Sequence, residues 1–475
     1  MCGIAGFCNF KENFEENTDY WNFRLEKMRA VLAHRGNDAR GRFLKKHIGL
    51  SHSRLAIRDI LCGDQPMTRT HNGYDYTICY NGEIYNTDEL IPELSENGFV
   101  CSTTSDTEVI LYAYIHWGAD FVSRLNGIFA FAIWDAAKNR LLLYRDRVGV
   151  KPLFYAIRDD SLVFGSEPKA CFAHPAVKPE LDKQGLQELL AIGPAHTSGL
   201  SLFKDLFEVL PGHFMIYSRD GLHDETYWEL TSREHTESYR DTVAHTRFLV
   251  EDAIKRQMVS DVPVCTFLSG GIDSSIVTAI AANYMNTRGK TLNTFSFDFK
   301  DNDRYFKANS FQPERDLPYV NRMLEEYETA HSYLECDENS LFKALFAAVD
   351  AKDMPGMTDV DSSLLYFCSL VSRKNKVALT GECADEIFGG YPWFYRKELL
   401  ERYGFPWSSD VAPRLVLLRD DVGLELDLSG YQAFRYEESR SKAPLLYGEA
   451  GEDESRRIIG YLNIKWFMQT LLDRM

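Results

Sequence analysis

The stretch Leu268-Ser269-Gly270-Gly271-Ile272-Asp273-Ser274-Ser275 joins an apolar run, Val262 to Leu268, to an apolar-periodic segment, Ile276 to Met285. This order predicts a strand, a glycine turn and a helix. Consecutive glycines let backbone N–H groups approach an anion, and the helix start adds a positive dipole end. Ser269, Ser274 and Ser275 add donors, and Asp273 offers a carboxylate to a metal ion that bridges phosphates. A serine-capped glycine turn without a ligand explains the stretch alone equally well.

An acidic loop follows another short apolar strand. Val377-Ala378-Leu379 leads into Thr380-Gly381-Glu382-Cys383-Ala384-Asp385-Glu386. Strands and helices alternate between the two loops, which predicts an α/β domain with a parallel sheet covered on both faces. Ligands of such sheets bind at the carboxyl ends of the strands, so we expect the two loops to lie together. Asp273 and Asp385 would then suit Mg²⁺ bound to a nucleotide, whereas the alternative is an acidic turn that complements a helix dipole.

Bulk composition excludes several classes of function. The 475 residues predict two or three domains, and a net charge of −17 argues against nucleic-acid and anionic-membrane partners. The longest apolar runs are too short to span a bilayer. The ten cysteines are scattered and none pair as CxxC, which argues against a zinc site and predicts a cytoplasmic protein with reduced thiols.

The second residue is a candidate nucleophile. Removal of Met1 would leave Cys2 with a thiol and an α-amine that titrates near neutrality. A buried structural thiol at the start of a strand is the alternative. Asn81-Gly82, at the end of a predicted strand over 76–80, offers an amide and a backbone N–H for an oxyanion. The same dipeptide is also the strongest short signal for a type I′ hairpin turn.

Two charged residues fit recognition of an amino acid. The planar fork of Arg54 suits a carboxylate, although the residue also fits an ordinary surface arginine. Asp106 begins an apolar-periodic stretch through Trp117. It suits either an ammonium group or the dipole at the start of a helix.

Five motifs of the first half give a specific resemblance. They are Cys2-Gly3-Ile4, His34-Arg35-Gly36, Ser51-His52-Ser53-Arg54-Leu55, Asn81-Gly82-Glu83-Ile84-Tyr85-Asn86 and Asp146-Arg147-Val148-Gly149-Val150-Lys151-Pro152-Leu153. Their order resembles that of class II glutamine amidotransferases. The resemblance implies an α/β/β/α sandwich similar to N-terminal-nucleophile hydrolases, with Cys2 as nucleophile and its own amine as base. It also implies Asn81 and Gly82 for the oxyanion, and Arg54, Asp106 and nearby Glu83 for the carboxylate and amine of glutamine.

The two loops of the second half resemble the ATP pyrophosphatase domain of asparagine synthetases. That resemblance implies glutamine, aspartate and ATP as substrates, with ammonia passing through an internal tunnel to an aspartyl-adenylate. The implied roles are Mg²⁺ binding for Asp273 and Asp385, a base for Glu382, nucleotide contacts for Leu268, Thr380 and Gly381, and a pyrophosphate cradle of Ser269, Gly270, Gly271, Ser274 and Ser275.

The expected organisation is a glutaminase domain over 1–210, a linker over 211–240 and a synthetase domain over 241–475. The helical pattern from Ile458 reaches Met475 without a cap, so we expect the chain to be incomplete there. A homodimer is left open. Two alternative functions also stay open: an amide or lactam synthetase acting on another acid, and a glutaminase or regulatory protein with an inactive second half.

Overall fold

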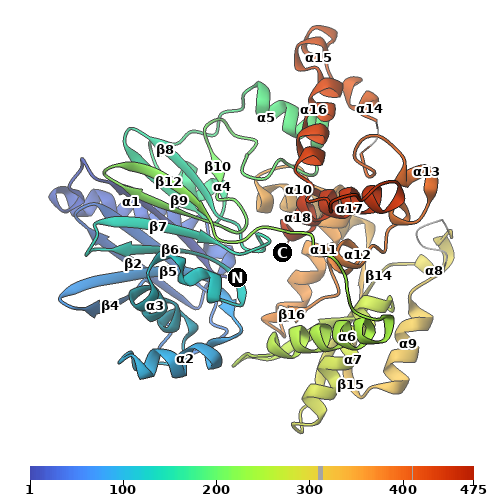
Figure 1. Ribbon diagram of the computed structural model, residues 1–475, viewed down its shortest axis with the longest axis horizontal. Helices are drawn as coiled ribbons and strands as arrows, with labels where there is room; N and C mark the ends of the chain where they lie inside the picture. The colour runs from blue at the N-terminus through green and yellow to red at the C-terminus, as the bar shows by residue number, and fades with distance from the viewer. Residues whose placement is uncertain (309–313, 409, 475) are drawn as a thin grey trace. The chain divides into compact units, whose positions relative to one another are not determined.

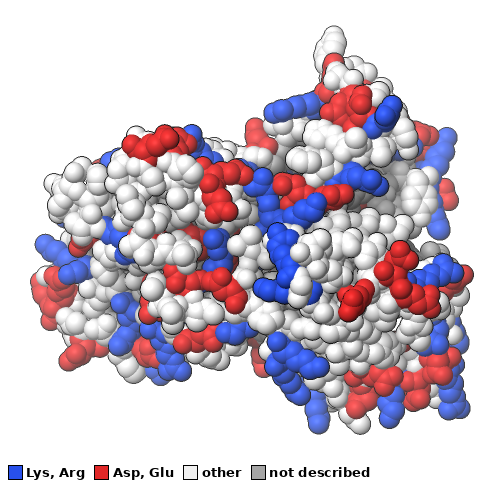
Figure 2. All heavy atoms as spheres, turned by 90° about the horizontal axis from the view of Figure 1, so that it is seen from below, with Lys and Arg blue, Asp and Glu red and all other residues white. Residues whose placement is uncertain are grey.

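The computed structural model describes residues 1–308, 314–408 and 410–474. The chain divides into two compact units, one formed by Met1–Ser232 with Pro392–Met475 and the other by Arg233–Tyr391. Within the described ranges, no helix has the length and apolarity that a membrane crossing requires. Acidic and basic side chains are intermixed over the face drawn in Figure 2.

The N-terminal half contains two six-stranded antiparallel sheets. The first sheet has the order β10 (Phe207–Glu208), β8 (Phe154–Arg158), β9 (Ser161–Gly165), β1 (Gly3–Asn9), β3 (Ile48–Arg54), β2 (Ala39–Lys45). The second has the order β12 (Gly221–Thr226), β11 (His213–Ser218), β7 (Arg140–Arg145), β6 (Gly127–Asp135), β5 (Tyr74–Ile84), β4 (Met67–His71). Helices α1 (Thr18–Ala30) and α4 (Pro168–Phe172) pack on the first sheet, and α3 (Asp106–Trp117), beside α2 (Thr87–Glu96), packs on the second (Figure 1).

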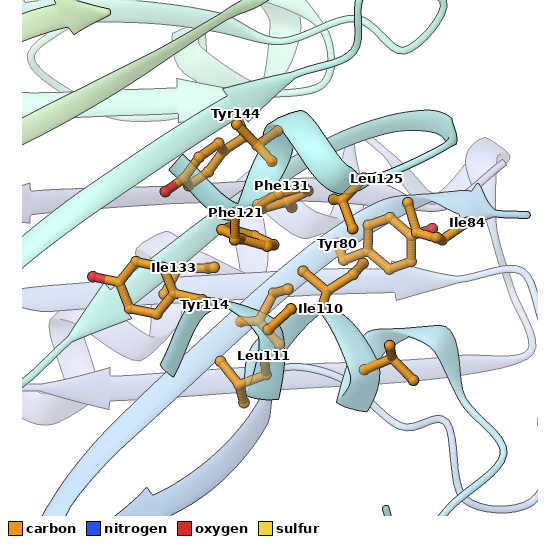
Figure 3. Close-up of a cluster of buried hydrophobic side chains, with 14 of the residues drawn as sticks. Tyr80, Ile84, Ile110, Leu111, Tyr114, Phe121, Leu125, Phe131, Ile133 and Tyr144 are labelled. Atoms are coloured by element: carbon orange, nitrogen blue, oxygen red, sulfur yellow. The ribbon is translucent and has the colours of Figure 1, made fainter. Parts of the chain in front are cut away.

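The two-residue period of the strands builds the layers. Along β6, Phe129, Phe131 and Ile133 point into one apolar cluster, whereas Ala130 and Ala132 point into another. The first cluster lies between this sheet and α3, whose Ile110, Leu111 and Tyr114 pack onto the aromatic side chains of the sheet (Figure 3). The second lies between the two sheets, and a third joins the other sheet to α1. Three apolar interfaces between four layers confirm the predicted α/β/β/α sandwich.

The predicted linker over 211–240 is wrong in its first part, because 213–218 and 221–226 form strands β11 and β12 of the second sheet. Pro211-Gly212 is the turn that starts this hairpin, and Gly212 has φ +76°. Phe214 and Met215 lie on opposite faces of β11 and enter different apolar clusters. A strand buried on both faces loses the alternating pattern that identifies half-buried strands, which hid it in the sequence.

The segment from Pro392 onward lies in the compact unit of the first half, although the sequence interpretation placed it in the second domain. Apolar side chains such as Phe405, Leu462 and Trp466 pack with Ala191 and Ile192 in one buried cluster. The helices of the segment are α13 (Lys397–Leu400), α14 (Ala412–Leu415), α15 (Asp420–Leu426), α16 (Leu428–Ser441), α17 (Glu452–Leu462) and α18 (Met468–Leu472), with a π-helical turn over Asn463–Phe467. The predicted helical pattern from Ile458 is confirmed through residue 472, and Met475 lies outside the described residues.

Arg145 is a buried charge that anchors this unit. It is 1% exposed and donates to the Glu208 carboxylate at 2.9 Å and to the carbonyls of Gly149, Lys151 and Val209. We expect Arg145→Met to lower the free energy of unfolding by about 3–5 kcal/mol, because removing one partner leaves a buried carboxylate under-compensated. Chemical denaturation of the pure protein measures the change. Arg158→Met, which removes an exposed ion pair with Asp205, is the matched control and should change stability little.

The second unit contains a four-stranded parallel sheet with the order β15-β14-β13-β16. Its elements are α6 (Tyr239–Arg256), β13 (Val264–Phe267), α7 (Ile272–Asn286), β14 (Leu292–Phe299), α8 (Asn302–Tyr305), α9 (Leu317–Glu326), β15 (Thr329–Cys336), α10 (Glu338–Lys352), α11 (Thr358–Val371), β16 (Val377–Leu379) and α12 (Ala384–Phe388). The predicted parallel α/β domain is therefore confirmed. The two glycine-containing loops follow β13 and β16, which are neighbours in the sheet.

Candidate active sites

Cys2 lies directly before β1, which pairs with β9 and β3 in the interior of the first sheet. The Leu55 N–H points at its Sγ, 3.4 Å away, and Arg35 Nε donates to its carbonyl oxygen at 3.0 Å. Glu167 in turn accepts from Arg35 at 2.7 Å. Burial raises the pKa of the thiol, and the nearby terminal amine opposes that shift. Burial, together with the positive charge of Arg35, lowers the pKa of the Met1 amine to about 5.

Asn81 and Gly82 lie inside β5, so the hairpin-turn interpretation is wrong. Asn81 pairs with Ala130 and Gly82 with Phe129 of β6. A Cβ atom at Gly82 would lie 2.2 Å from the Ile128 carbonyl oxygen, and this close strand contact requires glycine. The turn before β5 uses Asn72-Gly73 instead, both with positive φ.

The amide of Asn81 is the informative polar group of this strand. Asn81 is 1% exposed, and its Nδ2 has no hydrogen-bond partner within the described part of the chain. A buried donor without a partner destabilises a fold, so this amide is able to donate to an acceptor that binds beside it.

Asp106 and Glu83 form a close pair of carboxylates. Asp106 is the first residue of α3, and its Oδ2 accepts from the Tyr80 hydroxyl at 2.8 Å and the Ile84 N–H at 3.0 Å. Burial raises the pKa of both groups; the Asp106 charge raises that of Glu83 further, and Arg58 opposes both shifts. The structure thus brings both predicted carboxylates together.

Arg54 holds the loop that follows β3. Its two terminal nitrogens donate to the carbonyls of Arg58, Asp59 and Ile60, and Nη1 also donates to the Asp64 carboxylate at 3.0 Å. The Asp64 side chain is 77% exposed. A dissolved carboxylate can therefore take its place on Arg54, but only the Asp64 contact is free to exchange without opening the loop.

Four further residues of this site carried no assigned role in the sequence interpretation. Arg35 and Lys151 stood inside motifs that the resemblance rested on, so the signal was present there. Glu167 is recognisable only from its contacts with Arg35 and His34. No sequence pattern indicated Arg58, because the loop that carries it lies beside β5 only in the folded chain. Burial lowers the pKa of Lys151 to about 8.

The loop after β13 has the predicted strand-turn-helix geometry. Gly270 has φ +82°, and a Cβ there would lie 2.8 Å from the Asp316 carbonyl oxygen. Ser274 Oγ accepts from the Ser269 N–H at 3.2 Å and donates to the Gly271 carbonyl oxygen at 3.1 Å, which braces the loop from inside. Leu268 is buried and its N–H donates to the Phe295 carbonyl oxygen at 2.8 Å. The N-cap residue of α7 is Gly271, which has no side chain to cap the helix, so an anion can bind the N–H groups of its first turn.

Gly381 brings the second loop against the first. A Cβ at Gly381 would lie 2.7 Å from the backbone nitrogen of Ser274 and 2.9 Å from Asp273 Cβ. Thr380 Oγ1 accepts from the Glu382 N–H at 3.4 Å, and Cys383 has φ +71° where α12 begins. The predicted meeting of the two loops at the carboxyl ends of neighbouring strands is therefore observed.

Acidic side chains gather where the loops meet. Burial raises the pKa of Asp273 and Asp385, and the Asp385 charge raises that of Asp273 further. Glu386 is 2% exposed and accepts from the Tyr391 hydroxyl at 2.6 Å. Burial raises its pKa, and the charges of Asp385 and Glu382 add to the shift. A cation between Asp273 and Asp385 would relieve their repulsion, so this donor pair fits Mg²⁺, which takes one or two carboxylates and shares phosphates.

Comparison with known proteins supports the interpretation of both halves of the chain. Residues 1–228 match the family model of a glutamine amidotransferase domain, and residues 245–475 match that of asparagine synthase. Asparagine synthetase [glutamine-hydrolyzing] 3 of Bacillus subtilis (strain 168) is 47% identical over 475 residues, which are 100% of this chain and 76% of that protein. Asparagine synthetase [glutamine-hydrolyzing] 1 of the same organism is 33% identical over 84% of this chain and 60% of its own length. The amidase chyE of Penicillium rubens is 32% identical over 87% of this chain and 62% of its own length. The chain belongs to the family of glutamine-hydrolysing asparagine synthetases.

Proposed function

We propose that the chain makes asparagine from aspartate, ATP and glutamine. Glutamine is hydrolysed at Cys2 to glutamate and ammonia. ATP converts the side-chain carboxylate of aspartate into an acyl-adenylate with release of pyrophosphate, and ammonia then displaces AMP. The close approach of Gly381 to Asp273 and Ser274 supports the synthetase half of this proposal, because it brings the loop that leads to Asp385 against the start of α7.

The glutaminase step uses the groups around Cys2. We propose that Met1 is removed, so that the new α-amine belongs to Cys2 and takes the thiol proton as Sγ attacks the amide carbon. The tetrahedral intermediate places its oxyanion on Asn81 Nδ2, the buried donor that lacks a partner in the described residues, and on the Gly82 N–H. Protonation of the leaving nitrogen by the ammonium form of the base then releases ammonia and leaves a γ-glutamyl thioester on Cys2. Water attacks this thioester, which breaks the C–S bond, releases glutamate and returns the thiol.

Glutamine itself is held by charge. The α-carboxylate replaces Asp64 on Arg54, which already binds an exposed carboxylate there. The α-ammonium group lies against Asp106 and Glu83, whose pKa values are raised first by burial and, for Glu83, also by the Asp106 charge. A cation placed beside them would oppose both shifts.

The synthetase step uses the two loops. The pyrophosphate part of ATP binds to the start of α7 and to Ser269, Gly270, Gly271, Ser274 and Ser275. The rest of the nucleotide contacts Leu268, Thr380 and Gly381. Mg²⁺ held by Asp273 and Asp385 supplies charge neutralisation to the phosphates when it is bound. Glu382 takes a proton from the attacking nitrogen, and a half-buried carboxylate close to other acids suits that role.

Three broader expectations stay proposals. The first is that the glutaminase and synthetase activities belong to separate domains joined by a linker. Activity assays of each part, expressed separately, would test this division. Free thiols at all ten cysteines favour the cytoplasm. Sedimentation of the purified chain would decide whether it is a homodimer.

The decisive experiment is a product assay with ATP, Mg²⁺, aspartate and glutamine. Equal amounts of asparagine, AMP and pyrophosphate support the proposal. Adenylate formation with another acid but not with aspartate would show a different amide synthetase. Glutamate release without AMP, even when ammonium chloride is supplied, would leave a glutaminase alone.

Gly381→Ala should separate the two loops. The added methyl group collides with backbone atoms of α7, so one loop must move by several tenths of an ångström. Overpacking of this kind costs about 1–3 kcal/mol, and we expect AMP formation to fall at least about tenfold. Glutaminase activity should persist. Ala384→Gly, which adds no atom beside this contact, is the matched control, and equal losses in both variants would contradict the steric explanation.

A further inference from the structure

We propose that Arg58 is a positioning residue of the glutaminase site, which compensates the paired charge of Glu83 and Asp106 so that both can face the ammonium group of glutamine. This inference rests on the proposed glutaminase function and adds a residue to it.

The guanidinium of Arg58 is fixed beside the acidic pair. Nη1 donates to the Ile84 carbonyl oxygen at 2.9 Å and lies 4.0 Å from Asp106 Oδ2, and Nη2 donates to Thr87 Oγ1 at 3.3 Å. The side chain is 15% exposed. These contacts join the loop after β3 to the end of β5 and the start of α2, so the charge of Arg58 cannot swing freely into solvent.

Arg54 sets the position of Arg58. It donates to the backbone carbonyls of Arg58 and Asp59, and so closes the loop that presents the second arginine. Arg54 therefore holds the loop in its conformation, while Arg58 directs its charge toward the acidic pair. A lysine at 58 would retain the charge but lose the fork that contacts Ile84 and Thr87 together.

The charges around the pair show what Arg58 contributes. Both carboxyl groups face Arg58 and the hydroxyls of Tyr80 and Tyr85, as well as one another. Glu83 also faces the Cys2 thiol, Lys151 and the terminal amine. Arg58 Nη1 lies 4.0 Å from Asp106 Oδ2, and its charge opposes the raised pKa of both carboxyl groups. Lys151 adds to this opposition at Glu83, so the Arg58 charge is the part of the compensation that both carboxyl groups share.

Without the guanidinium, the repulsion between the two buried carboxylates is relieved when one of them is protonated. Two close carboxylates cannot both stay ionised, so one takes up a proton at a higher pH than before. The protonated member no longer attracts an ammonium group, and glutamine must displace that proton to bind. Loss of Arg58 should therefore weaken glutamine binding and make it depend on pH.

The test is Arg58→Met in the full chain, assayed as glutamate release. We expect the KM for glutamine at neutral pH to rise about tenfold, since one pKa unit of lost compensation corresponds to a factor of ten. The kcat should change less than about threefold, because Cys2 and Asn81 are untouched. The rise in KM should grow as the pH falls and shrink as it rises, because protons compete with the substrate for the pair. Arg58→Lys should recover most of the affinity.

Arg69→Met is the matched control. Arg69 donates to the buried carboxylate of Glu108 at 2.8 Å, on the same helix as Asp106 but outside the pair. It should lower thermal stability without changing the KM for glutamine or its pH dependence. Equal KM values for Arg58→Met and wild type across the pH range, or a rise in KM that does not depend on pH, would overturn the inference. Failure of the wild type to release glutamate would instead overturn the proposed function.

Discussion

Replacement of Cys2 by alanine is expected to abolish glutamine-dependent asparagine formation and to leave ammonia-dependent formation intact. The variant lacks the only nucleophile of the proposed hydrolysis, so glutamate release should fall by about 10³-fold or more. Asn81 can still polarise a bound amide, but polarisation alone does not supply a covalent intermediate. Supplying ammonium chloride bypasses this step, because ammonia then reaches the adenylate from solution.

The assay measures asparagine and AMP with each nitrogen source, on protein whose circular dichroism matches the wild type. Cys101→Ala is the matched control, since it removes a half-buried thiol of the same unit away from Cys2. It should leave both activities unchanged. A folded Cys2→Ala protein that loses both activities would contradict two separate sites.

The local part of each site was predictable because short segments determine it. A strand, two glycines and a helix follow one another at 262–285, and hydrogen bonds within Ser269–Ser274 maintain that geometry. The meeting of this loop with Gly381 followed from a general property of parallel sheets. Both inferences needed only the order of strands and helices, which the apolar periods reveal.

The Asn81-Gly82 dipeptide shows where local reasoning failed. The same two residues suit a hairpin turn and a strand interior, and only pairing with β6 decides between them. That pairing joins residues 81 and 130, so no window of neighbouring residues contains it. The burial of the Asn81 amide without a partner among the described residues likewise arises only in the folded chain.

Two further features depend on long-range packing and were not predicted from the sequence. They are strand β15 and the packing of residues 392–475 with the first compact unit. Strand β15 carries Thr329, His331 and Glu335 among its residues and is half-exposed over much of its length, so it gives a weak apolar signal. The C-terminal helices are defined by a cluster that includes Ala191 and Trp466, residues 275 positions apart in the sequence. Arg58 acquires its role in the same way, through a loop that crosses to another sheet.

Replacement of Asp385 by asparagine is expected to have the second large effect. Asp385 and Asp273 repel one another in the ligand-free protein, and burial raises the pKa of both. A group whose pKa is raised in the fold favours its neutral form, so removing its charge should not destabilise the free protein near neutral pH. The same charge is what the phosphates and Mg²⁺ of ATP require, so adenylate formation should fall by about 10²-fold or more.

Two measurements separate these opposing effects. The melting temperature without ligand should be unchanged or higher in Asp385→Asn, whereas the increase that Mg²⁺ and ATP produce together in the wild type should be lost. Glutamate release should continue, because its chemistry uses residues of the other unit. Asp252→Asn, which removes an ion pair with Arg256 on the surface of α6, should behave as wild type in both measurements. If Mg²⁺ and ATP stabilise Asp385→Asn as strongly as the wild type, the carboxylate does not take part in holding the metal, and Asp273 must do so without it.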